Sequence, residues 1–517
     1  MNVKELKGIF KSHLSGFLRG SVVGILVLIQ FSILIALSFL LQSYTVYFYV
    51  ILEILSLVVV IYLVNDYKSS SYKISWICII LLLPISGHIM FALWGKSTSN
   101  KKLGDIIRSK MKRGQTFLEI SKEIMDEINH KSPCIARLAR YMESQGFPLY
   151  KNNELTYYPM GEDMFAAMFN DLRDAKNFIL IDFFIVAEGG IWDELHKILL
   201  EKIREGVEVK FLYDDFGAMI RTPKNFKKSL EAEGFQIRVF NPIHKYTDKL
   251  YMNYRSHQKI VVIDGNIGYT GGVNIADEYA NLIDRFGVWK DNAIRVYGES
   301  VWGLTVTFFQ MWEVSSHAEY IDYFNYKPNA DFKPNDTLAG VISDGPIFNP
   351  GNPIESIYKQ IIHYAYNYIY ITTPYLIIEE DMQMALILAA KSGVDVRIIT
   401  PNIPDKKQVK ILTNYNYGVL LENGIRIYEY TPGFIHAKTI INENCGVIGT
   451  VNMDYRSFYL HYECGLFMCD EGIISSVRED FLKTLTECHE MTYEEWKNRP
   501  LTLKIYQNIL NLFSTLM

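Results

Sequence analysis

The sequence contains the same pair of reactive residue types twice: a histidine followed two positions later by a lysine. The two copies are His257-Gln-Lys259 and His436-Ala-Lys438, and none of the other histidines has a lysine at that spacing. Each copy precedes a run of β-branched residues, 260–263 and 439–441, which is typical of a strand. Side chains two residues apart on a strand lie on the same face. The pattern therefore predicts two imidazoles and two ammonium groups facing one shared cavity.

Each copy belongs to a longer pattern of small and polar residues. The first copy continues through Asp264, Gly271, Gly272 and Asn274, and the second through Glu443, Thr450 and Asn452. The arrangement resembles the signature of the phospholipase D superfamily, H-x-K-x4-D-x6-G-(S/G/T)-x-N, which is present twice per active site. The second copy departs from it, because a glutamate replaces the aspartate and the stretch that follows is one residue shorter.

The aspartate position of the signature reads as a hairpin corner. Asp264-Gly265 is a dipeptide typical of tight turns, so Asp264 is explained as well by a turn as by a reaction. Glu443 lies in a similar Asn-Glu-Asn turn and need not abolish chemistry. A deletion inside a strand would turn its side chains to the other face. We expect the missing residue to be absorbed in the turn, which leaves Thr450 and Asn452 facing the pocket.

The resemblance implies roles for the residues of both copies. One histidine would attack phosphorus while the other moves a proton, and His257 is favoured as the nucleophile because its half keeps the full pattern. The candidate catalytic residues are His257, Lys259, Asp264, His436, Lys438 and Glu443, and the candidate phosphate-binding residues are Gly272, Asn274, Thr450 and Asn452. The resemblance implies no metal and no other cofactor.

A carboxylate follows each copy of the pattern, Asp291 in the first half and Glu463 in the second. In the superfamily an acid after the asparagine holds the catalytic histidine. By position, each half would supply the acid that orients its own imidazole. A carboxylate on one ring nitrogen fixes the tautomer and stabilises the imidazolium.

The repeat extends to the elements that must position these residues. In the first half a strand at 178–185, a helix at 193–205 and a strand at 207–213 precede the motif; the counterparts are 368–373, 380–391 and 394–400. Gly206 and Gly393 each end a helix and lead into a strand, as helix C-caps do. Apolar strands alternating with helices favour an α/β fold with covered sheets. We predict two α/β/α halves, related by a pseudo-twofold axis, that share one active site.

The N-terminal residues have a different composition. No charged residue occurs between Gly20 and Leu52, and a membrane crossing needs about 20 apolar residues. We predict three crossings, at 21–41, 46–64 and 74–94, after a basic segment at 1–20. The remaining predicted divisions are a linker at 96–150, the two phospholipase D-like halves at 151–325 and 340–490, and an amphipathic tail at 491–517. The tail could lie on the bilayer or pack on the domain.

Composition excludes several classes of function. The net charge is −5, whereas proteins that bind a phosphate backbone usually carry a basic surplus, so nucleic acid is not the expected partner. The six cysteines form no CxxC pair, and their spacing indicates neither a zinc site nor a disulfide framework. The expected partners are membrane phospholipids, and no obligatory protein partner is evident.

The crossings and the motifs together resemble the bacterial cardiolipin synthases of the superfamily. By this resemblance the protein would be a multi-pass enzyme of the bacterial cell membrane and a phosphatidyltransferase. It would join two phosphatidylglycerols into cardiolipin and release glycerol through a phosphohistidine. The alternatives are phospholipid hydrolysis, transfer to another alcohol, and a catalytically silent membrane scaffold.

Overall fold

The computed structural model describes residues 25–30, 32, 35, 45–66, 68–95, 101–131, 133–219, 221–242, 253–315, 320–347 and 351–516. The chain divides into two compact units. One comprises residues 102–504, and the other comprises residues 1–101 together with 505–517. The predicted crossing at 21–41 lies largely outside the described residues.

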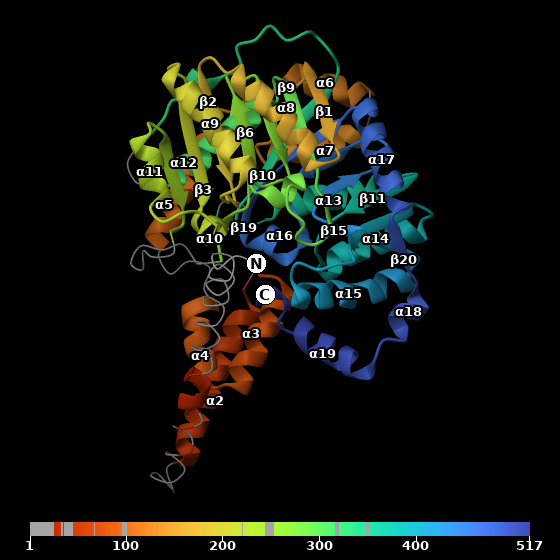
Figure 1. The fold of residues 1–517 in the computed structure, drawn as a ribbon. Helices are drawn as coiled ribbons and strands as arrows, with labels where there is room; N and C mark the ends of the chain where they lie inside the picture. The colour runs from red at the N-terminus through yellow and green to blue at the C-terminus, as the bar shows by residue number, and fades with distance from the viewer. Residues whose placement is uncertain are drawn as a thin grey trace. The chain divides into compact units, whose positions relative to one another are not determined.

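The larger unit contains two sheets with the same strand order (Figure 1). The first runs β1 (Asn153–Tyr158), β9 (Ala293–Gly298), β7 (Ile267–Gly271), β6 (Lys259–Ile263), β2 (Phe178–Phe183), β3 (Glu208–Asp214) and β4 (Gln236–Phe240). The second runs β10 (Leu338–Asp344), β19 (His461–Cys469), β17 (Gly446–Gly449), β16 (Thr439–Ile441), β11 (Tyr368–Thr372), β13 (Asp395–Pro401), β14 (Arg426–Tyr430) and β20 (Cys488–Met491). Each strand of the first sheet, from β1 to β4, corresponds in order to a strand of the second sheet, from β10 to β14. The predicted α/β fold with two repeats is confirmed.

Short strands connect the sheets or lie beside them. They are β5 (Arg255–Ser256), β8 (Val288–Lys290), β12 (Leu376–Ile377), β15 (Gly433–Ile435) and β18 (Met453–Asp454). β5 pairs in parallel with β19, and β15 pairs in parallel with β8. Each of these two pairs joins a strand of one half to a strand of the other.

Helices cover both faces of each sheet. In the first half they are α8 (Gly161–Arg173), α9 (Gly190–Arg204), α10 (Asp215–Ala218), α11 (Phe226–Ala232), α12 (Val301–Val314) and the 3-10 turns at Asp277–Ala280 and Tyr323–Tyr326. In the second they are α13 (Pro353–His363), α14 (Glu380–Lys391), α15 (Lys407–Glu422), α16 (Tyr455–Tyr459), α17 (Glu471–Leu485) and α18 (Tyr493–Lys497).

The strand β2 illustrates why the fold needs two helical layers. Ile179 and Ile181 point into a core shared with α8 and α9, whereas Leu180 points into a core shared with α12. All six residues of β2 are buried, which explains the continuous apolar run in the sequence. Gly206 and Gly393 have φ values of +89° and +95°, so both helices end in the left-handed conformation that favours glycine.

The segment 96–150, which we predicted to be a linker, carries three helices instead. These are α5 (Lys101–Gln115), α6 (Lys122–Lys131) and α7 (Pro133–Ser144). They bury apolar side chains, among them Met111 from α5 and Leu138 and Met142 from α7, in the cores of the larger unit. Burial of these side chains removes apolar surface from water, and this stabilises the segment as part of the unit.

In the smaller unit the predicted crossing at 46–64 is one helix, α2 (Thr45–Val64). Its residues Val46–Val64 form the one helix among the described residues that is long and apolar enough to cross a membrane. The predicted crossing at 74–94 is not continuous. It divides into α3 (Ser70–Leu82), α4 (Ser86–Met90) and a π-helix at Phe91–Gly95. Leu83 leaves the helical region because the following residue, Pro84, disfavours a helical conformation at the position before it.

The C-terminal residues form α19 (Leu501–Asn511) and a 3-10 turn at Ser514–Leu516. Within the smaller unit, Ser75 of α3 donates a hydrogen bond to the Leu512 carbonyl at 2.6 Å, and its Oγ lies 3.1 Å from Thr515 Oγ1. The end of the tail therefore packs against α3.

Candidate active site

The two motif histidines lie at the seam between the halves. His257 stands between β5 and β6, and its backbone N–H donates to the Tyr462 carbonyl of β19 at 2.8 Å. His436 stands between β15 and β16, and its N–H donates to the Lys290 carbonyl of β8 at 2.7 Å. Each histidine is thus held by the backbone of the opposite half, at the residue just before that half's acid.

The acids orient the histidines across the seam. Both Oε1 and Oε2 of Glu463 lie 2.9 Å from Nδ1 of His257, and Oδ2 of Asp291 lies 2.6 Å from Nδ1 of His436. Our prediction that each half supplies the acid for its own imidazole was wrong. The backbone hydrogen bonds explain the exchange, because they bring the acid-bearing strand of one half beside the histidine of the other.

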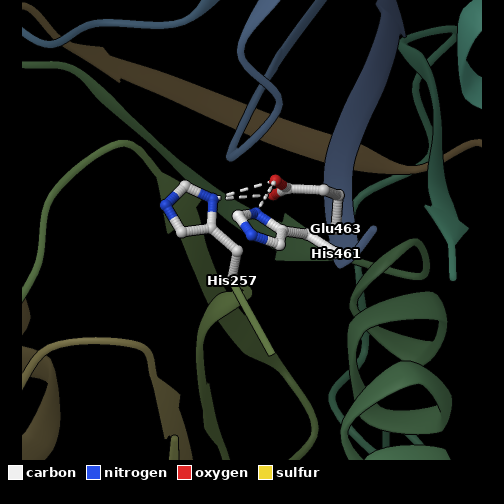
Figure 2. A group of neighbouring side chains, drawn as sticks. All are labelled: His257, His461 and Glu463. Atoms are coloured by element: carbon white, nitrogen blue, oxygen red, sulfur yellow. Dashed lines mark hydrogen bonds and ion pairs between the residues drawn. The ribbon is translucent and has the colours of Figure 1, made fainter. Parts of the chain in front are cut away.

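Glu463 is itself held by two hydroxyl groups. Thr450 donates to its Oε2, and Ser457 donates to its Oε1 at 2.7 Å. Figure 2 shows the carboxylate beside two imidazoles, that of His257 and that of His461. The orientation of His257 is therefore fixed through a hydrogen-bonded carboxylate.

The two lysines contact the histidines of their own motifs. Lys259 Nζ donates to the His257 carbonyl at 2.7 Å, while Lys438 Nζ contacts the His436 carbonyl and lies 2.9 Å from His436 Nδ1. Both side chains are buried, and burial lowers the pKa of Lys259 to about 8 and that of Lys438 to about 7. Carboxylates oppose this effect at both lysines; the charged groups that face Lys438 are Asp291, Lys259, Glu463 and Asp405.

Burial also disfavours the charged form of both imidazoles. It lowers the pKa of His257 well below its usual value and that of His436 to about 4, and the neighbouring lysines add to both shifts. Burial raises the pKa of Glu463 to about 8. Burial opposes ionisation of Asp291 as well, but His436 and Lys438 hold the pKa of Asp291 below its usual value. A neutral imidazole is the form that can attack phosphorus.

The candidate phosphate-binding residues are all buried but differ in what their side chains do. Asn274 accepts from the Ile185 N–H at 3.0 Å and donates to the Tyr279 hydroxyl at 2.8 Å, so its amide is engaged within its own half. Asn452 Oδ1 has no hydrogen-bond partner among the described residues. A Cβ on Gly272 would lie 2.0 Å from Asp291 Oδ1, so this glycine makes room for the acid.

Asp264 and Glu443 lie away from the histidines, and the structure contradicts their assignment as catalytic residues. Asp264 accepts three backbone N–H groups at 2.7–2.9 Å, from Lys176, Asn177 and Phe178. Glu443 accepts the equivalent three, from Tyr366, Asn367 and Tyr368, at 2.7–3.4 Å. Each acid therefore ties a hairpin corner to the start of the neighbouring strand, β2 or β11. This corner is five residues from the motif lysine, roughly 15 Å along an extended chain.

The shortened second motif keeps its register at the site. In the first hairpin Ile263 pairs with Ile267 across three turn residues, whereas in the second Asn442 bonds to Cys445 across two. The Gly449 N–H donates to the Lys438 carbonyl at 3.4 Å, so Lys438 stays opposite the motif glycine. The prediction that the turn absorbs the deletion is confirmed.

Sequence reasoning missed Ser457 and His461 as parts of this site. Ser457 belongs to the stretch Asp454-Tyr-Arg-Ser457 that follows the second motif. Its position in the sequence, five residues after Asn452, did not indicate that it contacts Glu463. His461 is two residues before Glu463, and that spacing on a strand was a usable signal because it predicts a shared face.

Comparison with known proteins agrees with this geometry. The family model described as "Cardiolipin synthase, PLD-like domain" matches residues 168–302 and 358–485, and the model "Phospholipase_D-nuclease N-terminal" matches residues 54–96. The fold and the paired histidines thus define a phospholipase D-like protein. The chain belongs to the cardiolipin synthase family with phospholipase D-like domains.

Individual relatives resemble the chain over most of its length. A Listeria monocytogenes protein named cardiolipin synthase is 30% identical over 92% of this chain and 100% of its own length. A Streptococcus mutans protein, described as uncharacterized, is 36% identical over 89% of this chain and 99% of its own. Among solved structures, phosphatidylserine synthase from Haemophilus influenzae has the same fold, with a TM-score of 0.57 and 14% identity over 74% of this chain and 100% of its own.

Proposed function

We propose that the protein is a cardiolipin synthase that transfers a phosphatidyl group between two phosphatidylglycerol molecules. The observation that carries the proposal is the crossed pairing of Glu463 with His257 and of Asp291 with His436. Two oriented imidazoles beside two buried lysines suit an attack on an anionic phosphodiester, and the relatives named cardiolipin synthase supply the substrate class.

In the first step Nε2 of His257 attacks the phosphorus of phosphatidylglycerol, because Glu463 occupies the other ring nitrogen. The bond from phosphorus to the glycerol oxygen breaks, and His436 donates the proton that releases free glycerol. The entering phosphodiester brings negative charge, which favours the protonated form of His436 beside the ionised Asp291.

In the second step the glycerol hydroxyl of another phosphatidylglycerol enters where the free glycerol left. His436 takes the hydroxyl proton, the oxygen attacks phosphorus, and the bond from phosphorus to His257 breaks. The product is cardiolipin, and both histidines return to their starting state.

The lysines stabilise the charge that develops on the phosphoryl oxygens. Lys259 and Lys438 are buried and held in place, so they need little reorganisation at the moment of reaction. Preorganised groups of this kind each contribute about 3–4 kcal/mol in comparable sites. Asn452 has an uncommitted side-chain oxygen, which can accept a hydrogen bond, and is our candidate for contact with the glycerol hydroxyl. Gly272 and Thr450 act indirectly, through Asp291 and Glu463.

We further propose that the protein is attached to the bacterial cell membrane. Its α2 helix has the length and composition of a crossing, and the apolar segment at 21–41 is our candidate for a second one. The broken helices α3 and α4 argue for a re-entrant or surface-lying segment rather than a third straight crossing. As domain limits we retain 151–325 and 340–490 for the two halves, and we add α5–α7 to the catalytic unit.

A product assay tests the function. Purified full-length protein is incubated with phosphatidylglycerol labelled in both its acyl chains and its glycerol headgroup, and the products are separated by chromatography. We expect cardiolipin and free glycerol in equal amounts. Phosphatidic acid as the main product would favour a hydrolase, a new phospholipid formed only with an added alcohol would favour a different transferase, and no turnover would favour a scaffold.

A further inference from the structure

A third imidazole lies beside the His257–Glu463 pair, and the mechanism does not use it. His461 Nδ1 is 3.5 Å from Glu463 Oε1, and the rings of His461 and His257 are 5.3 Å apart between centroids. Figure 2 shows both rings directing a nitrogen toward the same carboxylate. One nitrogen from each histidine and one carboxylate oxygen all lie within 4.8 Å of one another.

The His461 side chain is 11% exposed, and its Nδ1 has no hydrogen-bond partner among the described residues. A buried polar atom without a partner costs free energy, so its retention calls for an explanation. Arginine and lysine charges and burial together lower the pKa of His461 well below its usual value, burial being the largest cause. The charged form of the ring is therefore disfavoured, and Nδ1 lies near Glu463 without a hydrogen bond to any described residue.

The distances suit a small tetrahedral ion. Zinc binds nitrogen and carboxylate oxygen at about 2.0–2.2 Å, so neighbouring ligand atoms in a tetrahedral site lie about 3.3–3.5 Å apart. Glu463 Oε1 lies 2.9 Å from His257 Nδ1 and 3.5 Å from His461 Nδ1, and these two separations bracket that range. The third separation, between the two histidine nitrogens, is within 4.8 Å. The hydroxyls of Thr450 and Ser457 already hold the carboxylate, as outer partners do in metal sites.

We propose that His257, His461 and Glu463 form an inhibitory site for zinc or a similar borderline transition-metal ion. The ion takes the place of the proton between His257 and Glu463, and that proton moves to Nε2 of His257 or to solvent. A water molecule or a substrate oxygen is the fourth ligand. Binding of zinc itself does not depend on the proposed function, whereas the inhibition rests on it.

The surroundings select the kind of ion. Lys259 stands close enough to Glu463 to lower the pKa of that carboxyl group, so a cation in the site meets electrostatic repulsion. Strong bonds to imidazole nitrogen can offset this repulsion for zinc. Magnesium and calcium ions prefer several oxygen ligands, which this site lacks, so they should neither bind nor inhibit.

Inhibition follows from the loss of the orienting carboxylate. With the ion bound, Glu463 can no longer stabilise the positive charge that forms on His257 when its Nε2 bonds to phosphorus. The ion also withdraws electron density from the attacking ring. The enzyme without metal is then the active form, and a chelator leaves its activity intact or raises it.

The test uses the full-length protein, freed of metal with a chelator and then titrated with zinc chloride. A zinc-sensitive dye measures binding by competition, and the phosphatidylglycerol assay measures activity in parallel. We expect one zinc ion per chain at this site, loss of activity with the same midpoint, and recovery when the chelator is added back. In His461→Gln, zinc binding and inhibition should both require at least tenfold more zinc, since even outer partners of a metal contribute about 10–100-fold in affinity.

Two further variants keep the test decisive. His489→Gln removes an exposed histidine 3.3 Å from Glu495 and should leave zinc binding and inhibition unchanged. Ser457→Ala removes a partner of Glu463 and should weaken zinc binding. It replaces His461→Gln in the test if that variant does not fold. Equal zinc affinity in the wild-type and His461→Gln proteins, or no zinc bound to either, would overturn the proposal. If the protein makes no cardiolipin, the function fails, and the dye measurement still decides whether the zinc site exists.

Discussion

Replacement of Glu443 by alanine should reduce stability but leave turnover nearly unchanged. Its carboxylate accepts the N–H groups of Tyr366, Asn367 and Tyr368, and no group of the active site contacts it in the described part of the chain. The corner is exposed, so water can replace most of these hydrogen bonds. We estimate a loss of about 1–2 kcal/mol in the free energy of unfolding.

The contrast is with Lys438→Ala, which removes a buried amine that we propose stabilises the reacting phosphate. A loss of about 3 kcal/mol of transition-state stabilisation lowers kcat about 100-fold or more. We expect Glu443→Ala to keep kcat within about twofold. It should lower Tm by about 1–2 °C, as a loss of about 1–2 kcal/mol does in a unit the size of residues 102–504. The assays are product formation under saturating lipid and a thermal melt of each protein.

Asp264→Asn is the matched control in the first half. Asp264 has a φ of +52°, which asparagine tolerates better than alanine does, so this variant removes the charge and retains the turn. It should behave like Glu443→Ala. The reasoning is refuted if Glu443→Ala folds normally and is as inactive as Lys438→Ala, because Glu443 would then act in the reaction.

Three other predictions follow from the site and the fold. Asp291→Asn and Glu463→Gln should each reduce kcat by about two to four orders of magnitude, as loss of an orienting acid does elsewhere. Both variants should slow labelling of His257, since the first step needs the oriented His257 and the protonated His436; labelling at the wild-type rate in either variant would mean that the crossed contacts do not govern reactivity. As the pH rises through about 7, Lys438 loses its proton, so kcat/KM should fall on the alkaline side. Lys438→Arg should flatten that limb of the pH profile. An unchanged alkaline limb in Lys438→Arg would mean that another group causes the fall. A fragment of residues 102–500 should fold, because α5–α7 and both halves are retained. It should release more phosphatidic acid relative to cardiolipin than the full chain does. An unchanged product ratio would mean that the pocket alone excludes water.

The sequence was sufficient for the repeat and for the catalytic pairs. Alternating strands and helices, capped at Gly206 and Gly393, repeat in the same order in both halves, and the period-two spacing of His257 and Lys259 indicated a shared face. These features are local, so a pattern along the chain can reveal them.

The features that sequence reasoning missed depend on contacts between distant segments. Nothing near Asp291 or Glu463 in the sequence shows that the acid of one half faces the histidine of the other. The segment 96–150 was predicted to be a linker, although Ile128, Ile135, Leu138 and Met142 recur at helical spacing and are buried. The third predicted crossing was judged by hydropathy alone, which does not register the effect of Pro84 on the helix.

The proposed two-step transfer proceeds through a covalent bond between phosphorus and His257. Trapping that bond is the most direct test of the transfer. The full-length, metal-free protein is mixed briefly with phosphatidylglycerol labelled in its phosphate, quenched under alkaline conditions, digested and mapped by mass spectrometry. We expect an acid-labile label on Nε2 of His257 and no label in the His257→Ala protein. A label on His436 instead would exchange the roles of the two histidines. Failure to trap any label while cardiolipin is being formed would contradict the two-step transfer itself.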